Sequence, residues 1–221
     1  MNYNKHFELE GKHAILSASK CTSWLEKEPQ QVIDMSARAY ATTIGTALHD
    51  IARKHIRRRI KLTKAAKSEV ILSLIEDYKI PEYAIERGID FDAVYENIIF
   101  YVKDSINYRM IPEQILYYSE NCFGTADAIS SLDNVIFNKK LQIHDLKTGT
   151  TLVHIDQLEV YAALFCLEYN IKPFDIDIEL RIYQTSKNEI LCHHPAPDDI
   201  VHIMDQIITA DKYVTKYKEE N

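Results

Sequence analysis

Apolar residues recur at intervals of three or four through the first half of the chain. The clearest run extends from Phe91 to Tyr108, and this spacing places the apolar side chains on one face of a helix. Ser17-Ala18-Ser19 offers an N-cap for a short helix that Pro29 would stop. The pattern predicts helices over Ser17 to about Lys27, about Ser36 to Arg59, Leu62 to Tyr78, and Phe91 to Tyr108.

The second half alternates between short β-branched runs and further helical segments. Between Phe174 and Gln184 apolar residues alternate with charged ones, which is the period of a half-buried strand. Three earlier runs are typical of an antiparallel meander. The predicted strands are Gln114–Ser119, Gly124–Leu132, Leu141–Leu146, Phe174–Gln184 and Glu189–His193, and the predicted helices are His154–Glu168 and Asp198–Lys218.

This order of elements predicts an α/β (α+β) fold in which a central mixed β-sheet is flanked by helices. We expect a single domain over residues 1–221, because this length suits one core and no repeat or linker-like segment interrupts the chain. A mainly helical part would span 1–110, the sheet core 111–195 and a C-terminal helix 196–221.

Positive charge is concentrated in one segment of an otherwise acidic chain. The net charge is −7, yet the segment from Ile51 to Ser68 holds eight of the 26 Lys and Arg residues and no acid, which leaves 18 basic residues against all 33 acidic ones. Such a patch can bind phosphates and release counterions. A solvated, arginine-rich helix face explains the run equally well. The candidate nucleic-acid contacts are Arg53, Arg57, Arg58 and Lys61.

Composition and cysteine spacing favour a reduced, cytoplasmic compartment. No stretch approaches the roughly 18 apolar residues of a membrane helix, and the polar residues 1–10 lack the apolar region of a signal peptide. Cys21, Cys122, Cys166 and Cys192 form no C-x-x-C pair, which argues against a zinc or disulfide framework.

The strongest chemical signal is Ile143-His144-Asp145-Leu146-Lys147-Thr148-Gly149. Residues two apart on a strand project from one face, so Asp145 and Lys147 would lie side by side while His144 points the other way. A carboxylate can bind a hard divalent cation, and an ammonium group can orient water and stabilise developing negative charge. The triplet alone is also compatible with a surface salt bridge.

A second acid, Asp127, lies within the otherwise small and apolar strand segment Phe123-Gly124-Thr125-Ala126-Asp127-Ala128-Ile129. Burial of an unpaired carboxylate is costly, so Asp127 requires a partner or a metal. On a strand next to that of Asp145, the two carboxylates would converge on one cation. By itself, Asp127 is equally compatible with a capping or salt-bridged acid, and Glu113 and Glu120 are further candidates for an acid near the metal.

Together these motifs resemble the PD-(D/E)XK nuclease superfamily, in particular its RecB-type exonuclease branch, which includes phage-encoded and CRISPR-adaptation exonucleases. Each motif is short, but five of them in the expected order are specific. The resemblance implies a restriction-endonuclease-like core with a helical N-terminal half. The motifs are Ser17-Ala18-Ser19, Gly45-x-x-x-His49, Glu113-Gln114 leading to Gly124-Thr125-Ala126-Asp127, Asp145-Leu146-Lys147-Thr148-Gly149, and Gln157-x-x-x-Tyr161.

The resemblance also implies a metal site. His49, Asp127, Asp145 and the backbone carbonyl of Leu146 would bind Mg²⁺ or Mn²⁺, as one ion or two. Taken alone, a helical histidine such as His49 is more typical of a structural role.

The remaining matched residues would complete the catalytic machinery. Lys147 would contact the attacking water and the scissile phosphate, and Gln157 and Tyr161, one helical turn apart, would face the lysine or the DNA. Several members of this branch hold an iron–sulfur cluster through one N-terminal and three C-terminal cysteines. Here Glu28 stands at the N-terminal position and only Cys192 lies near the C-terminus, so we expect no cluster.

The predicted activity is hydrolysis of DNA phosphodiester bonds by an exonuclease that acts on linear ends in recombination or repair, a format that suits a phage enzyme. The alternatives are a site-specific or structure-specific endonuclease, and a non-catalytic DNA-binding subunit that retains the fold. DNA would be the main partner, and no membrane is implied. A second copy of the chain, an annealing protein or a helicase are further candidates, because the chain carries no Walker A motif of its own.

Overall fold

A mixed five-stranded sheet forms the centre of the molecule in the computed structural model, which describes residues 5–9, 14–131, 140–149, 154–184 and 189–220. The strand order is β1-β2-β3-β4-β5, and every neighbouring pair is antiparallel except β3 and β4. A parallel pair requires a crossover, which α6 supplies here. The strands are β1 (Ile111–Ser119), β2 (Cys122–Ser131), β3 (Lys140–Lys147), β4 (Asp177–Gln184) and β5 (Glu189–His193).

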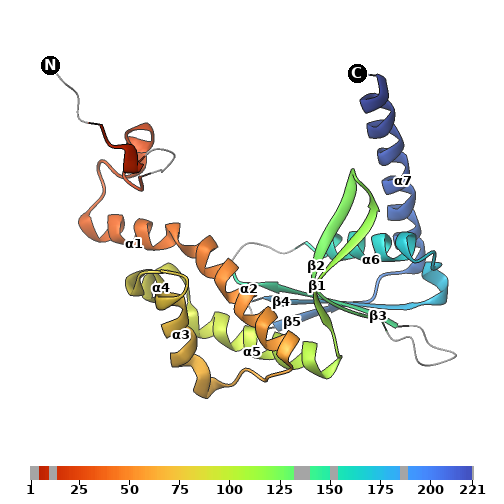
Figure 1. Ribbon diagram of the computed structural model, residues 1–221, viewed down its shortest axis with the longest axis horizontal. Coiled ribbons are helices and arrows are strands. Elements are labelled where there is room, and N and C mark those ends of the chain that lie inside the picture. Colours follow the sequence, from red (N-terminus) through yellow and green to blue (C-terminus); the bar gives the residue numbers. More distant parts are fainter. Residues whose placement is uncertain (1–4, 10–13, 132–139, 150–153, 185–188, 221) are drawn as a thin grey trace.

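Helices cover both faces of this sheet, which confirms the α/β fold with a helical N-terminal half (Figure 1). α5 (Phe91–Asn107) lies on one face and α6 (Asp156–Glu168) on the other. α7 packs against α6, and its C-terminal end projects from the body. The other helices are α1 (Pro29–Ala39), α2 (Ala41–Arg58), α3 (Lys67–Glu76), α4 (Glu82–Gly88) and α7 (Pro197–Glu220), with 3-10 turns η1 (Phe7–Leu9), η2 (Ala18–Ser23), η3 (Lys64–Ala66) and η4 (Pro173–Asp175).

The sheet separates two hydrophobic clusters, and the alternation of side chains along β3 decides which cluster each residue joins. Leu146 packs with α2 and α5, whereas Leu141 and Ile143 pack with α6. Because successive side chains on a strand face opposite sides, Asp145 and Lys147 share the α6 side with Ile143. None of the helices among the described residues is long and apolar enough to span a membrane.

The largest departures from the predicted elements occur before residue 90. Pro29 does not end a helix but begins α1, where its missing N–H costs no hydrogen bond. The segment before it forms only the 3-10 turn η2. The helix predicted from Ser36 to Arg59 is divided at Tyr40, whose N–H donates to the carbonyl of Ala37 in a tight turn.

Short elements account for the remaining differences. α4 was not predicted, because its seven residues are too few to display a helical period. The predicted helix from Leu62 starts as η3 and becomes α3 at Lys67, and the predicted strand from Phe174 starts as η4. The predicted strand end at Leu132 lies outside the described residues.

Candidate active site

A cavity of about 310 Å³ lies where β3 ends, between α2 and α6. The seven residues to which the resemblance assigns catalysis or metal binding all line it, although they come from four separate elements. Glu113 and Glu120, the further candidates for an acid near the metal, do not line it. Thr125, Thr148 and Gly149 also line the cavity and were quoted only as parts of motifs. The assigned residues are His49 from α2, Asp127 from β2, Asp145, Leu146 and Lys147 from β3, and Gln157 and Tyr161 from α6.

Asp145 is the most buried charged group of the cavity, with only 4% of its surface exposed. Burial raises the pKa of its carboxyl group, nearby Asp127 raises it further, and Lys147 acts in the opposite direction. The Nζ atom of Lys147 lies 3.0 Å from Oδ1 and 2.9 Å from Oδ2. Oδ2 is buried and accepts no hydrogen bond from any described residue. Among the described residues, Oδ2 of Asp145 is therefore compensated by the ammonium group of Lys147 and by no hydrogen bond.

Asp127 joins the strands to helix α2. Its Oδ2 atom accepts a hydrogen bond of 2.9 Å from the backbone N–H of Leu146 and lies 3.5 Å from Nδ1 of His49. The register explains this position: Ala128 pairs with His144, and because the strands are antiparallel, the preceding residue Asp127 lies toward Asp145. Two strands and one helix thus bring an imidazole and two carboxylates together.

A chain of hydrogen bonds orients Lys147. Its Nζ atom donates to Oε1 of Gln157 at 3.1 Å, and Nε2 of Gln157 donates to the hydroxyl of Tyr161 at 3.1 Å. Gln157 and Tyr161 are one turn apart on α6, so both side chains reach the cavity from the same face. The ammonium group is consequently fixed between a strand carboxylate and a helix amide.

Two glycines allow the elements around the cavity to approach closely. A Cβ atom on Gly45 of α2 would lie 2.7 Å from Oγ1 of Thr148, and one on Gly124 of β2 would lie 2.7 Å from Cε1 of Tyr161. Any larger residue at either position would displace a cavity-lining side chain.

Comparison with known proteins places the chain in a family. The family described as "Protein of unknown function (DUF2800)" matches residues 13–217. The chain belongs to the DUF2800 family. No curated protein and no solved structure matches it.

The donor atoms in the DUF2800 cavity fit a hard divalent cation. Carboxylate and carbonyl oxygens suit Mg²⁺ and Mn²⁺, and an imidazole is tolerated better by Mn²⁺. The buried Oδ2 of Asp145 accepts no hydrogen bond within the described part of the chain, but the ammonium group of Lys147 lies 2.9 Å from it. A metal ion would share this oxygen with the lysine or replace the lysine there. No three His, Cys, Asp or Glu side chains among the described residues are grouped so as to hold an ion in their present positions. Asp145 is turned to Lys147 and Asp127 to the N–H of Leu146.

The basic residues of this DUF2800 chain divide between two faces of α2. Arg53 and Arg57 follow His49 at intervals of four, so the three side chains form one row. Nη1 of Arg53 lies 2.8 Å from Oε2 of Glu113, and Nη2 of Arg57 lies 4.0 Å from the same oxygen. Arg53 also pairs with Asp50. This row leads from the cavity toward strand β1.

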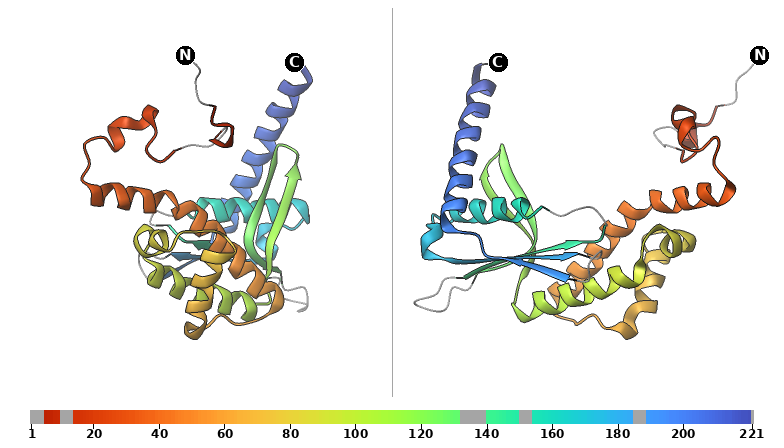
Figure 2. Two further views of the ribbon diagram at one scale, coloured as in Figure 1. Left: turned by 60° about the vertical axis from the view of Figure 1, so that its left-hand side comes forward. Right: turned by 180° about the vertical axis from the view of Figure 1, so that it is seen from behind.

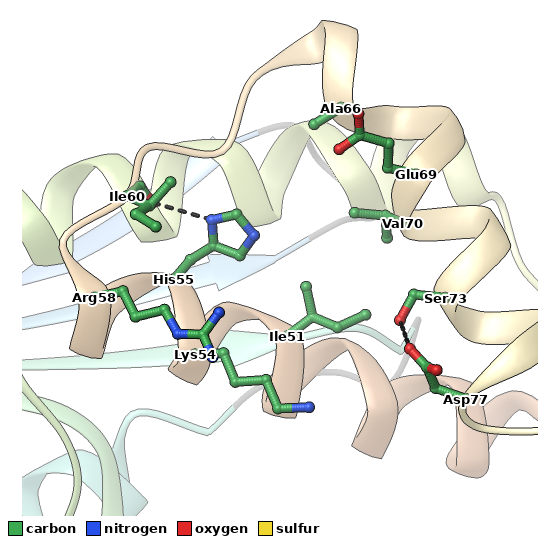
Figure 3. A pocket seen from close by; sticks show the side chains of 10 residues that line it. All are labelled: Ile51, Lys54, His55, Arg58, Ile60, Ala66, Glu69, Val70, Ser73 and Asp77. Atoms are coloured by element: carbon green, nitrogen blue, oxygen red, sulfur yellow. Dashed lines mark hydrogen bonds between the residues drawn. The ribbon is translucent and has the colours of Figure 1, made fainter.

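Arg58 lies on the other face, along a separate pocket of about 350 Å³ between α2 and α3 (Figure 3). Lys54 and His55 line the same pocket, and Ser73 and Asp77 stand across from them. Lys61 is exposed beyond the end of α2. Of the four predicted nucleic-acid contacts, only Arg53 and Arg57 therefore share the row of His49.

His144 projects away from the cavity, as the strand alternation predicts. It is fully buried on the α5 side of the sheet, and its Nδ1 atom lies 3.2 Å from the hydroxyl of Tyr183. Burial, together with the charge of Arg181, lowers the pKa of His144 to about 3. The ring is neutral at physiological pH and packs against Tyr108 and Tyr183 in the interior.

Proposed function

We propose that this protein is a divalent-metal-dependent deoxyribonuclease of the PD-(D/E)XK type that acts on linear DNA ends. One observation carries the proposal: Asp127, Asp145 and Lys147, on two adjacent strands, line the same cavity as His49 from a distant helix. Chance salt bridges explain single pairs of these residues. They do not explain the assembly of an imidazole, two carboxylates and an oriented ammonium group around one open space.

His49, Asp127, Asp145 and the carbonyl of Leu146 would hold Mg²⁺ or Mn²⁺. When bound, the ion supplies a positive charge that polarises the scissile phosphate and increases the acidity of water. Lys147 would then orient the attacking water and stabilise the negative charge that develops on the phosphate. Its hydrogen bonds to Asp145 and Gln157 fix the ammonium group in advance, so little reorganisation would accompany the reaction.

The row of His49, Arg53 and Arg57 would guide the DNA backbone. A guanidinium group binds phosphate oxygens in a bidentate manner and keeps its charge at any physiological pH. Arg57 is exposed, and its one ion pair with a described residue is the 4.0 Å contact with Glu113, so its charge is available to a phosphate.

A cleavage assay on linear and circular DNA tests this function. End-labelled linear DNA should be degraded in Mg²⁺ or Mn²⁺ and not in excess chelator, and comparison of 5′ with 3′ labels gives the polarity. Covalently closed circles should resist; cleavage of circles would indicate an endonuclease. Absence of metal-dependent cleavage of both substrates by the folded protein would refute the proposal.

A further inference from the structure

The β1–β2 hairpin rises from the sheet beside α7 (Figures 1 and 2). One of its faces packs against α6. Leu116 and Ala126 on this face are completely buried with the α6 cluster, and Gly124 lies against Tyr161. The tip is fixed to α7, because Ser119 and Asn121 both donate hydrogen bonds to Asp211, at 2.5 and 2.9 Å. The hairpin is thus anchored at its tip and has a defined inner face.

The opposite face of the hairpin is apolar and open to solvent. Ile115, Tyr117 and Phe123 expose 54%, 46% and 61% of their surface. The register pairs Tyr117 with Phe123 and Ile115 with Thr125, so the two aromatic rings are cross-strand neighbours. Contact between water and the apolar surface of two neighbouring aromatic rings is energetically unfavourable. This suggests a ligand whose apolar, planar surface covers the rings.

This face leads directly into the catalytic cavity. Thr125 lies on it and also lines the cavity, and Asp127 follows two residues later on β2. At about 3.3 Å per residue, Phe123 lies roughly 13 Å along the strand from Asp127, which a few nucleotides can span.

Cations border the same face at its base. Glu113 lies two residues before Ile115 on β1, and its carboxylate is approached by both Arg53 and Arg57. Arg53 also pairs with Asp50, which Lys54 contacts at 2.8 Å, so three cations face the two carboxylates of Glu113 and Asp50. This group keeps a net positive charge near the junction of the hairpin and the cavity. The phosphates of a nucleic acid can contact Arg53 and Arg57 while its bases stack on the rings of Tyr117 and Phe123.

We infer that Ile115, Tyr117 and Phe123 form a stacking platform that binds the unpaired bases of single-stranded DNA and leads the strand to the cavity. The class of ligand follows from the chemistry, since a duplex hides the faces of its bases whereas a single strand offers them for stacking on aromatic side chains. The delivery of the strand to a reactive centre rests on the proposed nuclease function, but the binding itself does not.

Binding of a fluorescent single-stranded oligonucleotide, measured by anisotropy without added metal in the Lys147→Ala protein, tests the platform. Phe123→Ala and Tyr117→Ala should each weaken binding roughly tenfold, and Phe123→Trp should preserve it. Phe123→Leu should also weaken binding, because leucine keeps the apolar surface and lacks the planar ring. Phe174→Ala is the matched control: its side chain is 64% exposed on η4, outside the hairpin, and its loss should leave the affinity unchanged.

Unchanged affinity in both hairpin variants would overturn the inference. So would equal losses for single-stranded and duplex DNA, or a shift of the monomer–dimer equilibrium by Phe123→Ala with no change in DNA affinity, which would assign the face to a second copy of the chain. Because the assay measures binding without metal, the platform can be confirmed even if cleavage is absent, and cleavage can be confirmed even if the platform fails.

Discussion

At the scale of single residues, Asp145 combines an unfavourable environment with a position that function would require. Burial and the neighbouring Asp127 raise the pKa of its carboxyl group, and its Oδ2 accepts no hydrogen bond from the described residues. A side chain selected only for stability would be neutral at this position.

The substitution Asp145→Asn separates the effect of Asp145 on stability from its proposed role as a metal ligand. The amide has the same shape without the buried charge, so we expect the free energy of unfolding to stay the same or increase by about 1 kcal/mol. Cleavage should fall at least about a hundredfold, because the amide is a poor metal ligand. Thermal unfolding and cleavage rates measured on one preparation check both effects. A strongly destabilised variant that still cleaves DNA would assign Asp145 a purely structural role.

Residue-scale features were the most predictable from the sequence. The two-residue period of a strand suffices to place Asp145 and Lys147 on one side of β3 and His144 on the other. The hydrogen bond from the N–H of Leu146 to Asp127 could not be predicted, because it depends on how β2 and β3 diverge beyond their last paired residues.

At the scale of elements, the close approach of α2 to the end of β3 sets the width of the cavity. Gly45→Ala should improve the helix propensity of α2 by up to about 1 kcal/mol. The new methyl group, however, would lie 2.7 Å from Oγ1 of Thr148 and would displace it or the helix. We therefore expect a larger loss of cleavage than of thermal stability.

A double variant distinguishes this contact from other effects of the substitution. Thr148→Ala removes the opposing atom, so Gly45→Ala combined with Thr148→Ala should recover the cleavage rate of Thr148→Ala alone. Purely additive losses would show that Gly45 does not act through Thr148.

Element boundaries were predictable where a periodic segment was long, as for α5 and α6, and were missed around prolines. Pro29 and Pro81 both precede or begin helices, although a proline after a helical run is equally typical of a helix end. Whether the helix lies before or after such a proline depends on which of the two segments packs against another element. Here α1, after Pro29, packs against α4, which is too short to be predicted.

At the scale of the whole molecule, a partly buried polar network joins the helical half to the sheet. Arg181 of β4 contacts Asp104 of α5 at 3.2 Å and Glu179 at 2.5 Å, and Lys140 of β3 donates to Glu179 at 2.7 Å. Burial raises the pKa of Glu179, but the hydrogen bonds from Lys140 and Arg181 outweigh it and lower the pKa to about 2. No local pattern predicts this network, because its members meet only in the folded sheet.

The depressed pKa of Glu179 predicts acid sensitivity. The carboxylate contributes stability above its ordinary pKa of 4.5, and this contribution is lost as the pH falls toward about 2. Glu179→Gln should lower the free energy of unfolding by about 2–3 kcal/mol at pH 7. Denaturant unfolding should show that difference shrink below pH 4.5, whereas exposed Glu76→Gln should have little effect at any pH. A pH-independent difference would exclude ionisation of Glu179 as the cause.

The decisive measurement is the cleavage rate of Lys147→Ala on linear DNA at saturating Mn²⁺. We expect a folded variant that still binds Mn²⁺ and leaves the DNA intact, since the ammonium group acts on the water and the phosphate rather than on the ion. If this variant degraded DNA at the rate of the unsubstituted protein, the proposed nuclease site would be wrong.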